Sequence, residues 1–192
     1  TDQNSTGYGY LEALCPTSVF AQSATDNCTP ATIGANFPRQ QVAEATMNGL
    51  TVKRTVDNVN DITTAVNTSA HCGGNVTYPV GLPLLRKNKT LTYEFSNPIK
   101  SAEVFLYYFG DNINEGTLDK LYFAVNNGTI SLTNVYDCHP GATIINGTHV
   151  ESLTKRVTTD VGIKVTSDKP FNNITLTDDN SDGGGYYVVI CP

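Results

Sequence analysis

Apolar and polar residues alternate along much of this chain with the period of two that marks half-buried β-strands. The clearest runs begin at Leu91 and at Leu121, where every second residue is apolar. Between them, residues 102–109 (AEVFLYYF) are apolar at nearly every position, so we expect a strand that is covered on both faces. Asn97-Pro98 separates the first two runs, because proline cannot donate a hydrogen bond to a strand ladder. The pattern predicts antiparallel strands.

Two Asn-Gly pairs have the composition of tight hairpin turns of type I′. Asn48-Gly49 is expected to join two strands within residues 46–56. Asn127-Gly128 is expected to reverse the chain at the end of the central block, so that the next strand returns antiparallel to the previous one.

About ten short strands separated by Gly, Asn and Pro predict an all-β fold, an antiparallel β-sandwich of jelly-roll or immunoglobulin-like type. Residues 1–40 lack regular alternation and are expected to form an extended N-terminal arm and a disulfide-tied loop. Residues 41–192 are expected to form the β-sandwich domain. Beyond the runs named above, the expected strands lie at residues 76–85, 143–145, 161–166, 174–177 and 186–191.

Composition narrows the possible functions. The 192 residues include 12 Lys plus Arg and 18 Asp plus Glu, a net charge of −6, which argues against nucleic-acid binding. No apolar run approaches the ~18 residues of a membrane span, so no transmembrane segment is expected. The first residue is Thr1 rather than Met, which predicts a mature product whose signal peptide has been removed.

Asn-X-Ser/Thr sequons are more frequent than composition explains. With 19 Asn and 36 Ser or Thr among 192 residues, chance gives about four sequons. The alternative is that an Asn- and Thr-rich chain contains them by accident. Their spread along the chain favours a secreted protein coated with glycans. The eight acceptors are Asn4, Asn27, Asn67, Asn75, Asn88, Asn127, Asn146 and Asn173.

The cysteines indicate an oxidising, extracellular compartment. We expect two intramolecular disulfides formed by Cys15, Cys28, Cys138 and Cys191. The spacing of the first two suits a local clasp, whereas Cys191 would fasten the last strand, and the connectivity stays open. The fifth cysteine, Cys72, makes the count odd, so one thiol is free or pairs with another chain. The pairs His71-Cys72 and Cys138-His139 contain the residue types of a zinc site, but their spacing does not support one. The alternative is a disulfide, or separate cysteines with incidental histidines.

Residues 178–183 (DDNSDG) match the start of a calcium-binding loop, in which alternate oxygen ligands turn inward and a glycine permits the bend. Val189 stands at the twelfth position, where such loops carry an acid, so another carboxylate is needed; Asp111 and Asp119 are the candidates. The alternative is a solvated hairpin loop. The predicted calcium ligands are Asp178, Asn180 and Asp182.

No catalytic template is present in the sequence. The chain lacks a G-x-S-x-G elbow, a phosphate-binding P-loop, an H-E-x-x-H helix and a G-x-G-x-x-G turn. We therefore predict that the protein is not an enzyme.

The combination of an extended arm, a many-stranded sandwich, low charge and dense sequons resembles that of secreted β-sandwich subunits of microbial surface appendages. These are the pilus and thread types that are joined by donor-strand complementation. The resemblance implies a structural or adhesive protein of the cell surface that forms filaments from copies of itself, each lending a strand to the open sheet of a neighbour.

The arm has features suited to that role. Tyr8 and Tyr10 would lie on one face of an extended segment, while Gly7 and Gly9 allow close backbone approach. We expect residues 1–14 to form a strand between subunits; the rival is an arm that folds back on its own domain. The alternative function is a calcium-assisted, lectin-like carbohydrate-binding module, with glycans as partners.

Overall fold

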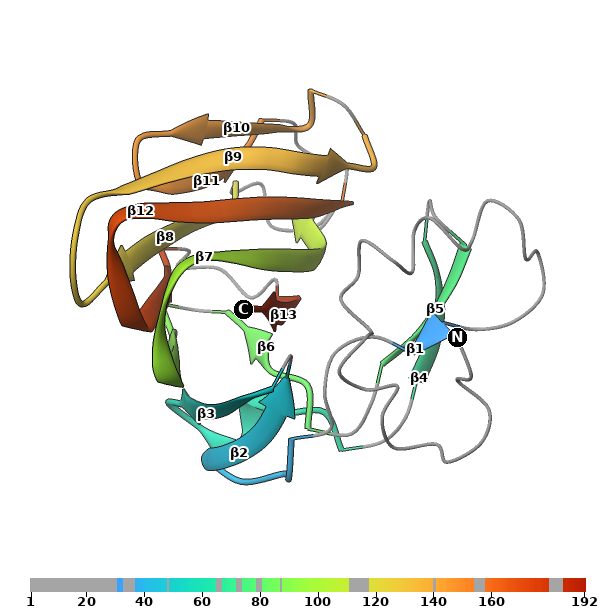
Figure 1. Ribbon diagram of the computed structural model, residues 1–192. Helices are drawn as coiled ribbons and strands as arrows, with labels where there is room; N and C mark the ends of the chain where they lie inside the picture. The colour runs from blue at the N-terminus through green and yellow to red at the C-terminus, as the bar shows by residue number, and fades with distance from the viewer. Residues whose placement is uncertain are drawn as a thin grey trace, which may run out of the picture.

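The computed structural model describes residues 31–32, 37–47, 49–64, 67–71, 74–78, 81–86, 88–110, 118–139, 141–153, 158–179 and 185–192. Ten strands form one large sheet and three form a small one (Figure 1). Every strand pair in the large sheet is antiparallel, which confirms the all-β, antiparallel prediction. The only helical element in these ranges is a single 3₁₀ turn, η2 (Val59–Asp61), capped by Asn58.

The strands of the large sheet vary widely in length. They are β2 (Val42–Met47), β3 (Leu50–Val56), β6 (Leu84–Leu85), β7 (Thr90–Gly110), β8 (Lys120–Val125), β9 (Ile130–Asp137), β10 (Thr143–Asn146), β11 (His149–Ser152), β12 (Thr158–Asp178) and β13 (Tyr186–Cys191). The small sheet contains β1 (Ala31–Thr32), β5 (Gly74–Tyr78) and β4 (Asn67–His71), in that spatial order.

The two longest strands, β7 and β12, bend and pair with each other in both halves of the sheet. In the first half, β3 lies beside β7 and β8 lies beside β12. In the second half, β13 lies beside β7 and β9 lies beside β12. The halves are thus parts of one continuous hydrogen-bonded sheet. The pairing does not separate the strands into two sheets, so the sandwich stays an expectation.

The first Asn-Gly turn is confirmed as a hairpin. Met47 pairs with Leu50 at the end of the β2–β3 ladder, and Gly49 has a φ of +75°, which glycine adopts without strain. Alternation along β3 is also confirmed, because Val52 and Val56 are buried.

The prediction of a hairpin at Asn127-Gly128 is wrong. β8 and β9 do not pair; both run antiparallel to β12, one beside each of its halves. Residues 126–129 form a corner that follows the bend of β12. The Thr129 N–H donates to Asp168 Oδ1 at 2.6 Å, and Asn126 Oδ1 accepts from the Asn173 N–H at 3.1 Å. Hydrogen bonds between side chains and backbone, in both directions, thus join the corner to the bend.

Asn97-Pro98 likewise marks a bend rather than the end of a strand. β7 continues through this pair, and residues 96–98 are exposed where its register with β12 shifts. The runs expected at 161–166 and 174–177 are the two halves of β12.

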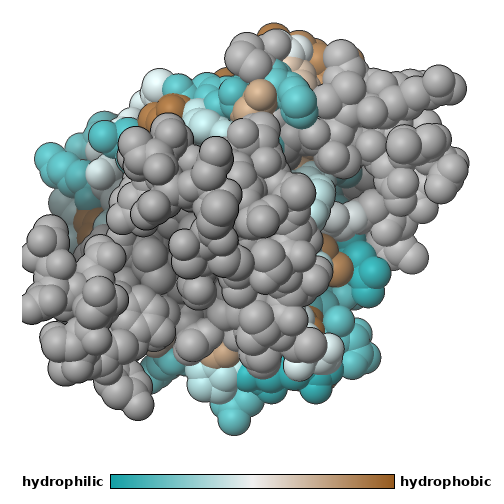
Figure 2. Space-filling view, turned by 90° about the vertical axis from the view of Figure 1, so that its right-hand side faces the viewer, coloured by the Kyte–Doolittle hydropathy of each residue, from teal (hydrophilic) through white to brown (hydrophobic). Residues whose placement is uncertain are grey.

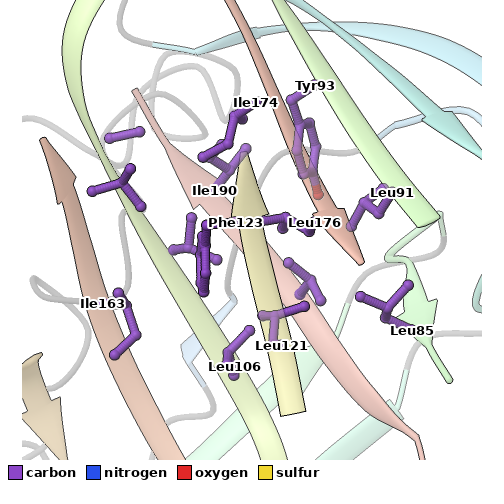
Figure 3. Close-up of a cluster of buried hydrophobic side chains, with 14 of the residues drawn as sticks. Leu85, Leu91, Tyr93, Leu106, Leu121, Phe123, Ile163, Ile174, Leu176 and Ile190 are labelled. Carbon is purple, nitrogen blue, oxygen red and sulfur yellow. The ribbon is translucent and has the colours of Figure 1, made fainter. Parts of the chain in front are cut away.

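Buried side chains from both halves form one main core (Figure 3). Figure 3 shows Leu106 of the second half beside Leu121 of the first. Alternate β7 residues, including Phe105, join a smaller buried cluster on the other face, which confirms the strand predicted to be covered on both faces. Gly162 fits this cluster because a Cβ there would lie 2.6 Å from the Phe105 ring.

Candidate functional site

Two acidic residues meet a buried tyrosine where β8, β12 and β13 begin or end. Asp178 is the last residue of β12, Asp119 precedes β8, and Tyr186 opens β13; their exposed fractions are 1%, 2% and 0%. Asp178 pairs with Leu121, two residues beyond Asp119, so the two acids are diagonal neighbours across the ladder. Burial, then the charges of Asp178 and Asp119, raises the pKa of Tyr186 well above its usual value.

Asp119 ties three strands together. Its Oδ2 accepts a hydrogen bond from the Gly110 N–H at the end of β7, at 2.9 Å. Its backbone N–H donates to Ser152 Oγ at 3.0 Å, and its carbonyl accepts from the Ser152 N–H at 3.0 Å. The carboxylate of Asp119 is therefore held by β7, and its backbone is held by β11.

Only some of the predicted calcium ligands lie among the described residues. The charges of Asp178 and Asp119, the second of which was a candidate for the missing carboxylate, both act on Tyr186. Asp111, Asn180 and Asp182 lie outside the described residues. Within the described ranges, no group of three or more His, Cys, Asp or Glu side chains could hold a metal ion. Calcium binding therefore stays a prediction.

The large sheet is open, and β9 is its longest edge strand. In the part of the chain that the structure describes, β9 pairs with β12 alone. Its sequence, ISLTNVYD, is rich in β-branched and aromatic residues and has one charged side chain, Asp137. Ile130 and Leu132 are half-buried against the core, whereas Val135 is 41% exposed. An edge of this kind is a template for another strand.

The register identifies which backbone groups of β9 face outward. The Asp168 N–H donates to the Thr129 carbonyl at 3.2 Å, so the bonded pairs of this antiparallel ladder recur at Ser131 and Thr133. The intervening N–H groups of Leu132 and Asn134 point to the open side. These are the donors that an added strand would use.

A second edge strand, β10, ends near β9. Thr143 Oγ1 at the start of β10 donates to Asp137 Oδ2 at the end of β9, at 3.0 Å. β10 pairs with β11 alone among the described strands, and its Ile144 is 45% exposed while Ile145 packs against the core. Among the residues that are coloured in Figure 2, hydrophobic ones occur as small patches beside hydrophilic ones.

Three predicted glycan acceptors are exposed at turns. Asn88 has a φ of +57°, Asn127 lies in the β8–β9 corner, and Asn146 ends β10. Asn173 differs, because it is half-buried within β12 between β7 and β8. The other acceptors are Asn67 at the start of β4, Asn75 in β5, and Asn4 and Asn27 outside the described residues; glycosylation stays a prediction.

Cys138 and Cys191 are both disulfide-bonded. Cys191 ends β13 and pairs with Glu103 of β7, whereas Cys138 follows β9. The remaining cysteines, and Tyr8 and Tyr10 of the arm, lie outside the described residues.

Sequence reasoning missed a polar cluster on β11 and β8. His149 Nε2 lies 2.5 Å from Glu151 Oε1, and the Tyr122 ring stacks on the imidazole with centroids 4.6 Å apart. The hydrogen bond to His149 lowers the pKa of Glu151, with a further contribution from Lys120. The spacing His-x-Glu was the available signal, since strand residues two apart share a face.

Comparisons with protein-family models, with curated proteins and with solved structures find no match for this chain. Among the described residues, no helix is long and apolar enough to cross a membrane.

Proposed function

We propose that this chain is an extracellular, glycosylated structural subunit that assembles with copies of itself by strand addition to β9. The observation that carries the proposal is the open edge of β9, eight residues long, with the N–H groups of Leu132 and Asn134 directed away from β12. The extracellular location is inferred from the sequon excess and from the disulfides at Cys138 and Cys191.

Strand addition would satisfy both the backbone and the side chains of this edge. An extended segment gives main-chain hydrogen bonds to the outward groups, and its alternate side chains cover Ile130 and Leu132, which are only half-buried. The proposed donor is the arm, residues 1–14, whose two tyrosines would share one face. A strand from another copy would thus complete the sheet.

One observation favours the alternative, a calcium-assisted carbohydrate-binding module. Asp119 lies with Asp178 around Tyr186, so a carboxylate is present near the loop that the sequence identifies. Calcium takes six to eight oxygen ligands. Asp119 and Asp178 are the candidate ligands that lie among the described residues.

A proline substitution at the edge tests the proposal. Asn134→Pro removes an outward N–H but keeps the β9–β12 ladder, because edge strands tolerate proline whose nitrogen faces solvent. Asn134→Ala removes the same exposed side chain and keeps the N–H. We expect Asn134→Pro to abolish assembly at an unchanged melting temperature, and Asn134→Ala to assemble like the wild type. Sedimentation and electron microscopy measure assembly.

Thr133→Pro is the control for the ladder itself. Its N–H belongs to the bonded pair with Lys164, so proline here should lower the melting temperature. A wild type that stays monomeric at high concentration, or an Asn134→Pro protein that assembles normally, would exclude strand addition at β9.

A further inference from the structure

We propose that N-linked glycans at Asn127 and Asn146 shield the edges of β9 and β10. They would admit a single extended strand but exclude the edge of a second folded sheet. The inference rests on the proposed function, since it concerns the selectivity of the same edge.

Both acceptors lie at the ends of edge strands. Asn127 is three residues before Ile130, where β9 begins, and Asn146 is the last residue of β10, at the tip of the β10–β11 hairpin. Both are exposed. A bulky, hydrophilic glycan at either position would therefore stand at one end of an edge strand.

The hydrogen bonds of these side chains are compatible with a glycan. Asn127 Nδ2 donates to the Pro170 carbonyl at 2.9 Å, and the Asn146 side chain is a hydrogen-bond partner of Glu151. N-glycosylation replaces one of the two amide hydrogens and leaves the other as a donor. Each asparagine can therefore carry a sugar and keep its contact.

Among the described residues, few other features protect these two edges. Natural sheets shield edges with lysine, proline, very short strands or bulges. β10 is short, at four residues. However, β9 and β10 contain neither Lys nor Pro, and each exposes a large apolar side chain, Val135 and Ile144. β9 has one register shift against β12. The glycans supply the covering that the side chains do not.

Asn88 and Asn173 provide a contrast. Asn88 precedes β7, a strand that pairs on both sides, and Asn173 lies inside β12 between two neighbours. A sugar at Asn88 would leave both edges uncovered. It is therefore the matched control for shielding.

Three threonine-to-alanine substitutions remove the relevant sequons and keep each asparagine. Thr129→Ala and Thr148→Ala unblock the two edges, and Thr90→Ala removes the control glycan. The backbone bonds survive: the Thr129 N–H to Asp168, the Phe123 N–H to the Thr148 carbonyl, and the Thr90 N–H to Asp57. The proteins are secreted from eukaryotic cells, and glycopeptide mass analysis measures occupancy.

We expect the Thr129→Ala/Thr148→Ala double variant to show a several-fold rise in irregular, sedimentable aggregate that binds a cross-β dye, while Thr90→Ala behaves like the wild type. Equal aggregation of the double variant and the wild type, equal aggregation of Thr90→Ala, or bare Asn127 and Asn146 in the wild type would overturn the inference. Because the readout is aggregation, it is informative even where Asn134→Pro disproves strand addition.

Discussion

The guanidinium of Arg54 lies against the ring of Phe37, its central carbon 4.9 Å from the ring centroid. The side chain is fully buried, and burial lowers its pKa. Its Nη1 donates to the Gly81 carbonyl, and its Nη2 donates to the carbonyls of Gln40 at 2.8 Å and Pro38 at 3.2 Å. One side chain of β3 therefore joins the segments before β2 and before β6.

Arg54→Leu should destabilise the fold strongly. The substitution fills part of the space but leaves three carbonyls without this donor, each costing about 1–3 kcal/mol where it is buried. Lys53→Leu is the control on the same strand, because its pair with Glu94 at 3.2 Å is exposed and such pairs contribute only about 0–1 kcal/mol. Denaturant titration measures both free energies of unfolding, and equal losses would show that Arg54 does not hold these segments.

The sequence predicted the face of β3 but not the burial of Arg54. Alternation with Val52 and Val56 places the arginine on the core side, yet the acceptors that make its burial tolerable are carbonyls of distant segments. Backbone carbonyls leave no signature in a side-chain pattern. The alternation of apolar and polar residues along a strand therefore indicates which face a side chain lies on, but not which groups it contacts.

The sequence pattern did not predict the bends of the long strands, for the same reason. Asn127-Gly128 has the composition of a reversal, and only the bend of β12 at residues 167–172, about forty positions later, makes it a corner. The acidic site was partly predictable, since the motif indicates Asp178 and Asp119 was a named candidate. Their approach to Tyr186 depends on the β8–β12 register, which pattern alone does not fix.

Stability should fall at alkaline pH because of buried tyrosines. Burial and the nearby acids raise the pKa of Tyr186 in the folded state, while burial first and then Asp160 raises that of Tyr107. The unfolded chain releases these protons near pH 10, so the stabilisation is complete below that pH and is lost as pH rises toward the folded pKa. Each tyrosine contributes a slope of about 1.4 kcal/mol per pH unit.

Tyr186→Phe should make this alkaline decline shallower by about one proton. Urea titrations across the alkaline range measure the slope, and the ultraviolet absorbance of tyrosinate follows ionisation directly. Identical slopes in the wild type and the variant would show that Tyr186 ionises alike in both states.

Calcium binding at Asp178, Asn180 and Asp182 has its own expected outcome. Chelation should lower the melting temperature, since a ligand at a hundred times its dissociation constant adds about 2.7 kcal/mol. Asp182→Ala should remove this response, and Ser181→Ala, at a position between the predicted ligands, should keep it. Superimposable melting curves of the wild type with and without chelator would leave only the hairpin-loop interpretation of this segment.

Deleting residues 1–14 tests the source of the added strand. If the arm of one copy pairs with β9 of another, the truncated protein should stay folded and monomeric, because its sheet is intact and only the donor is missing. A synthetic peptide of residues 1–14 should then bind the truncated protein.

The Asn134→Pro substitution in the truncated protein should abolish that binding, because it removes the outward N–H opposite the peptide. Calorimetry measures the peptide affinity and light scattering the mass. A truncated protein that still polymerises would place the donor elsewhere in the chain, and one that unfolds would show that the arm belongs to its own domain.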